Sequence, residues 1–421
     1  MTERLLHYIW QFNYYHGSFL KTTENIPLQV IHPGILNTNQ GPDFLNAKIK
    51  IGETTWVGSV EIHIQSSEWN EHNHTDDTNY TNVILHVVWQ EDYKLNLPFA
   101  TLVLEDRVSN VLLSRYEELM LTIGFIACEH HISKADEIVV QFWKERLVIE
   151  RLQERTVKII DILSSNQTNW EETFWWMLAR NFGMKVNSDS FEKIAQSIPI
   201  KVLAKHKNQI HQLEALLLGQ AGTLDKQFSE AYPNMLRKEY VYLQKKYNLK
   251  KIHYPLYYLR MRPANFPTLR LAQLAALVHS SKHLFSHVIA ATNINELKQL
   301  LNITANDYWH YHYLFDEVTT FSKKNLGAQM IDNILINTSI PMLYAYGYYN
   351  NSERCKQKAV DWLRELAPEK NAITKGFETL AISNKCAHDS QALLHLKKNY
   401  CNEKQCLNCG IGNALLRYHG P

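Results

Sequence analysis

The spacing of hydrophobic positions changes along the chain and predicts two structurally different parts. Up to about residue 115, apolar residues alternate with polar ones or form short β-branched runs that are separated by turn residues. Leu5–Tyr15 instead has the spacing of a short amphipathic helix. The fourth strand expected after it is apolar almost throughout, as in a central strand that is buried on both faces. The expected strands are Pro27–His32, Phe44–Ile51, Trp56–Gln65, Val83–Trp89 and Phe99–Leu104.

From about Glu137 onward, apolar residues recur every three or four positions, which indicates helices with one apolar face. The first of these helices reaches Leu163, and the later ones cover Thr173–Phe182, Gln209–Leu218, Asn234–Lys246, Leu269–Val278, Ala328–Ile336, Ser352–Leu366 and Ser390–Tyr400. We therefore predict an α+β fold. A small mixed-sheet unit in residues 1–115 is followed by a large all-helical body in residues 116–421, which ends in a cluster of cysteines.

Composition excludes several classes of protein. With 421 residues, 45% of them hydrophobic, the chain can bury a large core, and 15 glycines and 12 prolines are too few for a turn-rich all-β protein. The net charge of +2 means that any nucleic acid would bind to a local patch. No apolar run reaches about 18 residues, and we expect the first 20 residues not to be a secretory leader, because they lack a basic start and an apolar block. Six cysteines, three of them in the last 21 residues, do not resemble a secreted disulfide framework. We expect a cytoplasmic protein without a membrane partner.

Two acidic residues lie on neighbouring expected strands, at positions that a hairpin would bring together. Asp43 follows Gly41-Pro42 and opens one strand, while Glu61 and His63 lie two residues apart in the next and therefore share one face. The carboxylates of Asp43 and Glu61 can converge on one Mg²⁺ or Mn²⁺ ion, which can activate water and neutralise charge on a phosphoryl group. The ordinary alternative is that Asp43 belongs to a β-turn and Glu61 is a solvated strand residue.

The pattern Pro42-Asp43, 17 residues, Glu61-Ile62-His63 resembles the PD-(D/E)xK nuclease superfamily. The resemblance implies a restriction-endonuclease-like N-terminal unit and a nucleic-acid substrate. It also implies that Asp43 and Glu61 bind the metal and that His63, at the position of the family's lysine, lies near the attacking water. A neutral imidazole does not supply the fixed cation of a lysine. The prediction is therefore a Mg²⁺- or Mn²⁺-dependent nuclease or phosphodiesterase, and the alternative is a degenerate nuclease-like fold that serves as a non-catalytic binding or scaffold module.

Nearly the whole chain also resembles an uncharacterised bacterial family, a domain of unknown function found mainly in Bacteroidetes. The segments that carry the resemblance are Gly41-Pro42-Asp43-Phe44, Val60-Glu61-Ile62-His63, Arg262-Pro263-Ala264-Asn265-Phe266-Pro267 and the final cysteine cluster. It implies a domain organisation but no activity.

Histidines gather between the second acid and the buried strand. The run His72-Asn73-His74-Thr75-Asp76-Asp77 is similar to the HxHxDH signature of the metallo-β-lactamase superfamily, with Asp77 in place of the last histidine. A zinc hydrolase that uses His72, His74 and Asp76 is therefore a further, less favoured hypothesis. Alternatively, His72 and His74 contact substrate beside the metal site, or they belong to an exposed polar loop. His86, within an apolar strand, is expected to be a buried, partnered histidine.

An arginine-bearing loop precedes one of the expected helices. Arg260 and Arg262 stand among two prolines, and a guanidinium group can bind a phosphate through two hydrogen bonds. These residues are therefore candidates for substrate binding. The favoured alternative is that they pair with helix C-termini or with acids at a domain interface.

The last cysteines have the spacing of a metal site. Cys401, Cys406 and Cys409 form a C-x4-C-x2-C pattern that can bind zinc or a [4Fe–4S] cluster. Some nucleases of the resembled superfamily carry such C-terminal clusters. Cys386 is the favoured fourth ligand, with His395 and His419 as alternatives. We expect such a centre to be structural, and the ordinary alternative is three reduced thiols.

Overall fold

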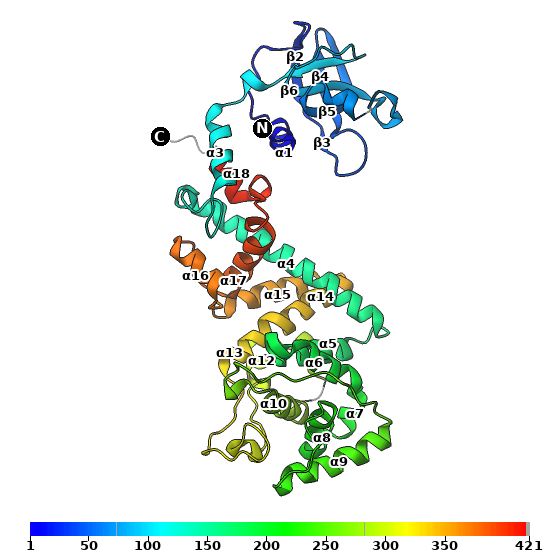
Figure 1. Ribbon diagram of the computed structural model, residues 1–421, viewed down its shortest axis with the longest axis vertical. Coiled ribbons are helices and arrows are strands. Elements are labelled where there is room, and N and C mark those ends of the chain that lie inside the picture. Colours follow the sequence, from blue (N-terminus) through cyan, green and yellow to red (C-terminus); the bar gives the residue numbers. More distant parts are fainter. Residues whose placement is uncertain (73, 282, 418–421) are drawn as a thin grey trace. The chain divides into compact units, whose positions relative to one another are not determined.

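The computed structural model describes residues 1–72, 74–281 and 283–417, and the chain divides into two compact units (Figure 1). The sheet unit contains residues 1–143 together with the described residues from Lys397 onward, and the helical unit contains residues 144–396. The chain enters the helical unit within helix α4 (Glu137–Ser165) and leaves it after Leu396. The first compact unit thus continues past residue 115, the boundary expected from sequence.

One mixed β-sheet forms the centre of the sheet unit. Its strands run in the order β1-β2-β4-β5-β6-β7, with the short β3 paired to β4. Neighbours from β1 to β5 are antiparallel, whereas β5, β6 and β7 are parallel. The strands are β1 (Leu20–Lys21), β2 (Pro27–His32), β3 (Ile35–Leu36), β4 (Phe44–Ile51), β5 (Thr54–Gln65), β6 (Val83–Gln90) and β7 (Ala100–Val103). All five strands expected from the hydrophobic pattern are present, and β6 is buried along most of its length.

Helix α1 (Glu3–Gln11) covers part of this sheet next to β5 (Figure 1). The side chain of Thr2 caps its N-terminus by accepting the Leu5 N–H at 3.3 Å. Its apolar face, which includes Ile9 and Trp10, is completely buried, and the Trp10 indole N–H donates to the Pro33 carbonyl at 2.9 Å. This anchoring leaves the polar face of α1 directed toward the start of β4.

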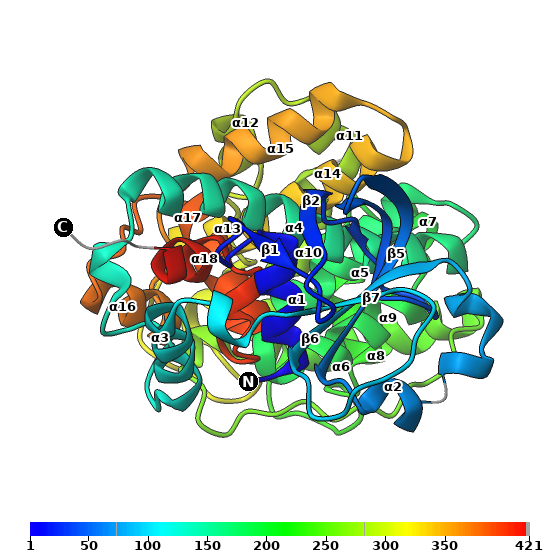
Figure 2. The same ribbon diagram turned by 90° about the horizontal axis from the view of Figure 1, so that it is seen from above.

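The C-terminal segment belongs to the sheet unit because it packs against helix α3 (Asn110–Leu121). Helix α18 (Gly410–Arg417) lies beside α3, and both helices can be followed in Figure 2. The Lys404 ammonium donates to the carbonyl of Thr122 at 3.2 Å and to that of Met120. Residues distant in sequence therefore form one folded body.

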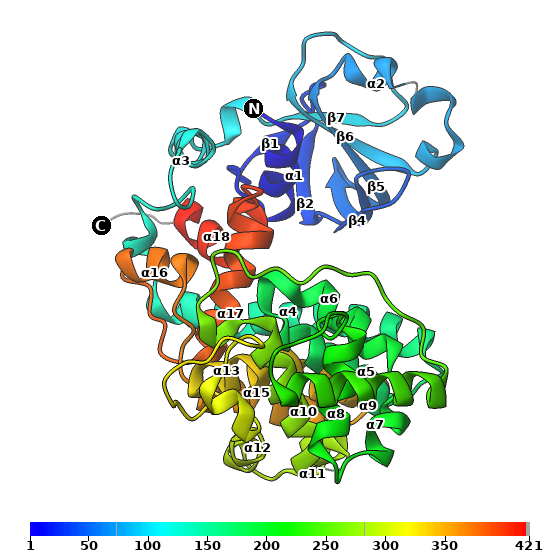
Figure 3. The ribbon, with the colours of Figure 1, turned by 60° about the horizontal axis from the view of Figure 1, so that its bottom comes forward.

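The helical unit confirms the change of period in the sequence. Helices α8 (Ile210–Gln220), α9 (Ala231–Tyr247) and α10 (Pro267–Ser280) lie side by side within it (Figure 3), and α10 is buried nearly all round. A π-helical turn at Leu335–Ser339 connects α13 to α14. The other helices are α5 (Trp170–Phe182), α6 (Met184–Ser197), α7 (Ile200–Lys205), α11 (Leu284–Ala290), α12 (Ile294–Leu300), α13 (Ala328–Ile334), α14 (Ile340–Tyr349), α15 (Glu353–Glu365), α16 (Ala372–Thr379) and α17 (Ala387–His395).

The described part of the helical unit contains isolated β-bridges but no strand. The chain therefore has the predicted α+β fold, with a mixed sheet followed by a large helical body. None of the described helices combines the length and the apolar character that a membrane span requires.

Candidate functional site

Asp43 and Glu61 meet where β4 begins and β5 passes beside it. The antiparallel register pairs Phe44 with Val60, so Asp43 lies next to Glu61. The Asp43 N–H donates to Glu61 Oε2 at 3.0 Å, and the Ile62 N–H donates to Asp43 Oδ2 at 2.9 Å. A turn with positive φ at Gly41 (+105°) leads into this contact. The two acids lie side by side, and each carboxylate has one oxygen bound to the backbone of the other strand.

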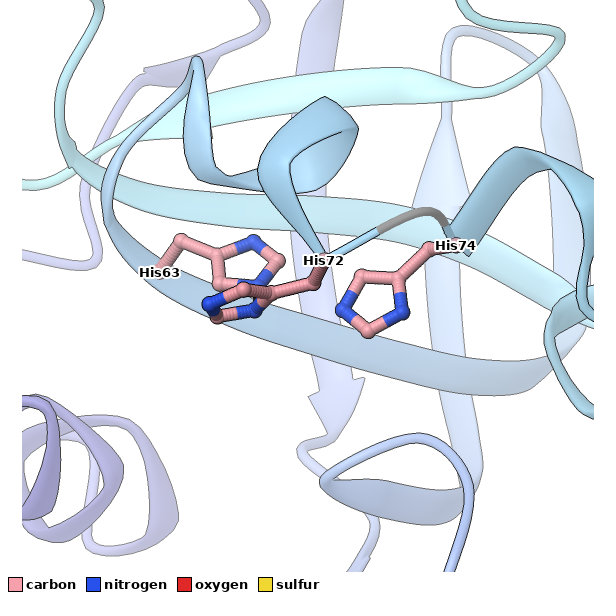
Figure 4. Close-up of side chains that lie close together, drawn as sticks. All are labelled: His63, His72 and His74. Atoms are coloured by element: carbon pink, nitrogen blue, oxygen red, sulfur yellow. The ribbon is translucent and has the colours of Figure 1, made fainter.

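Three histidine side chains converge beside this acid pair (Figure 4). His63 comes from β5, His72 follows the short helix α2 (Glu68–Glu71), and His74 opens the next helical turn. One ring nitrogen of each lies within 4.8 Å of the others, and His63 Nε2 is 3.2 Å from His72 Nδ1. His63 is fully buried, His74 is nearly so, and His72 is exposed. The loop after β5 therefore brings two histidines back over the strand.

Glu61 joins the acid pair to the histidines. Its Oε1 atom lies 3.6 Å from His63 Nε2 and 3.3 Å from His74 Nε2. Ligands of a tetrahedral ion with bonds of about 2.1 Å are about 3.4 Å apart. Each of these two separations is compatible with a pair of ligands on one metal ion, whereas among the described residues the groups of three ligand atoms within 4.8 Å are those of His63, His72 and His74 and of Glu3, His7 and Asp43. We refer to Asp43, Glu61, His63, His72 and His74 together as the acid–histidine site.

Helix α1 adds two residues that the sequence did not single out. His7 Nε2 lies 3.2 Å from Asp43 Oδ2, and Glu3, one turn earlier on the same helix face, lies 4.0 Å from His7 Nε2. One ligand atom each from Glu3, His7 and Asp43 lies within 4.8 Å of the others. The i, i+4 spacing of Glu3 and His7 indicates that the two side chains share one face of the helix. It does not indicate that this face packs against Asp43.

His86 supports the site from behind. It is fully buried in β6, as expected, and its Nε2 atom lies 2.9 Å from His63 Nδ1. The parallel register that pairs Glu61 with His86 places both side chains on the same face of the sheet. When His63 Nδ1–H donates to His86, the lone pair of His63 Nε2 faces Glu61 and His72.

Aromatic rings enclose the histidines. Trp69 is buried, contacts His63, His74 and His86 edge-on, and donates its indole N–H to Thr75 Oγ1 at 3.0 Å. The Tyr80 ring stacks on His74 with centroids 3.9 Å apart. Sequence reasoning missed both residues, although an aromatic residue in an otherwise polar segment was a weak signal.

Burial controls the protonation of these groups. It is the main cause that raises the pKa of Glu61 to about 9, and the nearby charge of Asp43 raises it further. Burial, followed by proximity to His86, lowers the pKa of His63 to about 2, and burial and then His74 lower that of His86 to about 4. The pKa of His74 is also lowered. His63, His74 and His86 are therefore neutral at pH 7, which is the form that binds metals.

Three buried ring nitrogens at the site lack hydrogen-bond partners among the described residues. His86 Nδ1 lies behind the site, whereas His7 Nε2 and His74 Nε2 lie near the carboxylates of Asp43 and Glu61. Buried polar atoms are normally paired. A cation held between these nitrogens and carboxylates would satisfy both kinds of group, so the donor set fits a divalent metal ion.

The other residues singled out in the sequence lie elsewhere. Arg260 and Arg262 are exposed in the helical unit, in the loop before α10. Asp76 belongs to the helical turn His74–Asp76, and its side chain is outside the described part.

The cysteines are divided between the two units. Cys401, Cys406 and Cys409 lie in the sheet unit, whereas Cys386 is half-buried before α17 in the helical unit. His395 lies in α17, 3.5 Å from Glu150 Oε2. His419 is outside the described residues.

Comparison with known proteins identifies the family but no activity. No curated protein and no solved structure matches the chain. A family model with the description "protein of unknown function (DUF2851)" matches residues 3–372, which include the sheet, the acid–histidine site and most of the helical unit. The expected membership of an uncharacterised family is thus confirmed: the chain belongs to the DUF2851 family.

Proposed function

We propose that the protein is a divalent-metal-dependent hydrolase of phosphodiester bonds in nucleic acid, with the metal held by Asp43 and Glu61. The observation that carries this proposal is that Glu61, already joined to Asp43, places its second carboxylate oxygen 3.3–3.6 Å from two histidine nitrogens. Burial keeps the proton on Glu61, and the ionised Glu61 carboxylate would need a cation beside it to compensate its charge.

The chain's own residues would hold and orient the reacting groups. Asp43 and Glu61 bind the ion, and His63, fixed by His86, presents Nε2 to the same point. When bound, a divalent ion activates water and neutralises charge on a phosphoryl group. Because His63 is neutral, it acts as a ligand or a hydrogen-bond acceptor rather than as the cation that a lysine would supply.

Nucleic acid is the proposed substrate because of where the acids lie. An N-terminal helix, the antiparallel strands β2, β4 and β5, and a parallel β6 follow the order of the PD-(D/E)xK core, except that its second helix is represented only by the four-residue α2. The two acids stand at the start of β4 and within β5, as in that superfamily. This agreement supports the proposed substrate class.

The ligand types favour Mn²⁺ over Mg²⁺. Mg²⁺ prefers oxygen ligands, whereas this site mixes carboxylate oxygens with imidazole nitrogens. The convergence of His63, His72 and His74 within 4.8 Å also favours a second candidate, a zinc hydrolase whose ligands are these three histidines. Activity with different metals distinguishes the two.

The test uses the full-length protein, treated with chelator and then supplied with Mg²⁺, Mn²⁺ or Zn²⁺. Labelled single- and double-stranded DNA and RNA are the substrates. Asp43→Asn and Glu61→Gln should each lower Mn²⁺-dependent cleavage at least 100-fold with an unchanged circular dichroism spectrum. Glu53→Gln, the same change in the exposed turn after β4, should have no effect.

The outcomes separate the alternatives. Cleavage that survives both substitutions would remove the acid pair from the mechanism. Cleavage with Zn²⁺ alone that is lost in His72→Ala would favour the zinc hydrolase. Metal binding without cleavage of any of these substrates would contradict the proposal and favour a non-catalytic binding module.

A further inference from the structure

Four of the six cysteines gather in the sheet unit, although one of them is far from the others in sequence. Burial raises the pKa of Cys401 and of Cys128, and neighbouring thiols raise it further: Cys409, Cys128 and Cys406 for Cys401, and Cys409 and Cys406 for Cys128. The four side chains therefore lie near one another. Cys128, Cys406 and Cys409 are buried, and Cys401 is half-buried. The remaining two, Cys355 and Cys386, lie in the helical unit.

Tight backbone turns present these thiols. The Cys128 carbonyl accepts the N–H groups of His131 and Ile132 at 3.0 and 2.9 Å, just before the short helix that packs against α18. Cys406 opens a helical turn, and the Cys406 carbonyl accepts the Cys409 N–H at 3.3 Å. A side chain at Gly412 would lie only 2.4 Å from the Cys406 carbonyl oxygen, so the close approach of α18 requires glycine there.

Two backbone N–H groups point at the Cys409 sulfur. It receives the backbone N–H groups of Ile411 and Gly412 at the start of α18, and the Trp143 side chain also faces it. N–H groups that point at a sulfur stabilise its negatively charged form and tune thiolate-bound metal centres. Burial still raises the pKa of the Cys409 thiol overall, and these donors only reduce that rise.

Three positive side chains lie near two of the cysteines. Arg4 and Lys404 lie within electrostatic reach of Cys406, and Lys397 lies within reach of Cys401. Lys404 is held in place by the carbonyls at the end of α3. A divalent ion bound to four thiolates carries two negative charges, which these cations would balance.

We propose that Cys128, Cys401, Cys406 and Cys409 bind one thiolate-ligated metal centre, a zinc ion or an iron–sulfur cluster. The centre links the loop after α3 to the C-terminal segment, and Cys128 takes the place that the sequence suggested for Cys386. This site is separate from the acid–histidine site, so it stands independently of the proposed hydrolase activity.

The spacing of the sulfurs bears on which centre binds. In the described residues, the groups of three ligand atoms within 4.8 Å of one another contain no cysteine. A single zinc ion with Zn–S bonds of about 2.3 Å would therefore require the side chains to move closer, whereas a polynuclear cluster holds its thiolates further apart.

Full-length protein purified without oxygen tests the proposal. We expect either about one zinc per chain, or iron with acid-labile sulfide and absorbance near 400 nm. Cys128→Ser should lose the metal, whereas the matched control Cys386→Ser should keep it. Retention of metal in Cys128→Ser, or its loss in Cys386→Ser, would overturn the assignment.

A second measurement does not depend on folding of the variants. In the native wild-type protein, Cys355 and Cys386 should react with iodoacetamide, and the other four cysteines should react only after a chelator or an oxidant removes the metal. Mass spectrometry of the digested protein measures the extent of alkylation at each cysteine. Metal-free protein in which the four thiols react freely, or form disulfides, would contradict the proposal.

Discussion

His86 should control metal affinity although it does not face the metal. His86→Leu keeps β6 apolar and removes the acceptor that lies 2.9 Å from His63 Nδ1. Without this acceptor, the buried His63 ring has two states. It keeps its proton on Nδ1 without a partner, or it moves the proton to Nε2 and blocks the atom that faces Glu61 and His72.

Both states cost binding free energy. A buried donor left without an acceptor costs about 1–3 kcal/mol. Because about 1.4 kcal/mol corresponds to a tenfold change in affinity, the metal should bind about 10- to 100-fold more weakly. Loss of the outer partner of a ligating histidine generally has an effect of this size, about 10- to 100-fold.

Isothermal titration of chelator-treated protein with Mn²⁺, and with Zn²⁺ in competition with a fluorescent chelator, measures the change. Long-range ¹H–¹⁵N NMR of the histidine rings shows which His63 nitrogen carries the proton, a readout that a general loss of stability would not shift. His86→Gln, which retains an acceptor, should recover part of the affinity. His32→Leu, in exposed β2 of the same sheet, should leave the affinity unchanged.

An affinity within twofold of wild type in a folded His86→Leu protein would refute the reasoning. So would a His63 ring that carries its proton on Nε2 in the metal-bound wild-type protein. Either result would mean that His86 is only a packed side chain.

Two further predictions concern stability. Burial raises the pKa of Glu214 from 4.5 to about 7. The contribution of the protonated Glu214 to stability is therefore complete below pH 4.5 and is lost as the pH rises through 7. Between pH 4.5 and 8, wild type should lose about 3 kcal/mol of unfolding free energy that the Glu214→Gln variant retains. Urea unfolding at both pH values measures this, and equal pH dependence in the two proteins would contradict it. Gly58→Ala would place a methyl group 2.6 Å from the Asn82 carbonyl oxygen and should lower stability by about 1–3 kcal/mol, whereas Gly17→Ala, with open space around it, should have little effect. Thermal melts that show equal losses would argue against a steric cause.

Local sequence patterns were sufficient for the elements and for part of the site. Period-2 alternation identified the strands and placed Glu61 and His63 on one face, because a strand reverses its side-chain direction at each residue. The short connection between β4 and β5 implied a hairpin, and a hairpin brings the residue before β4 beside the middle of β5. The convergence of Asp43 and Glu61 could therefore be predicted from residue spacing.

Only the tertiary structure decided the rest, because contacts between distant segments leave no local period in the sequence. His7 reaches Asp43 only through the packing of α1 on the sheet, and His72 and His74 reach His63 only through the fold of the loop after β5. Cys128 joins the C-terminal cysteines because α3 and α18 pack together, whereas a search along the sequence favoured the nearer Cys386. Periodicity reports which face of an element is buried, and packing determines what that face meets.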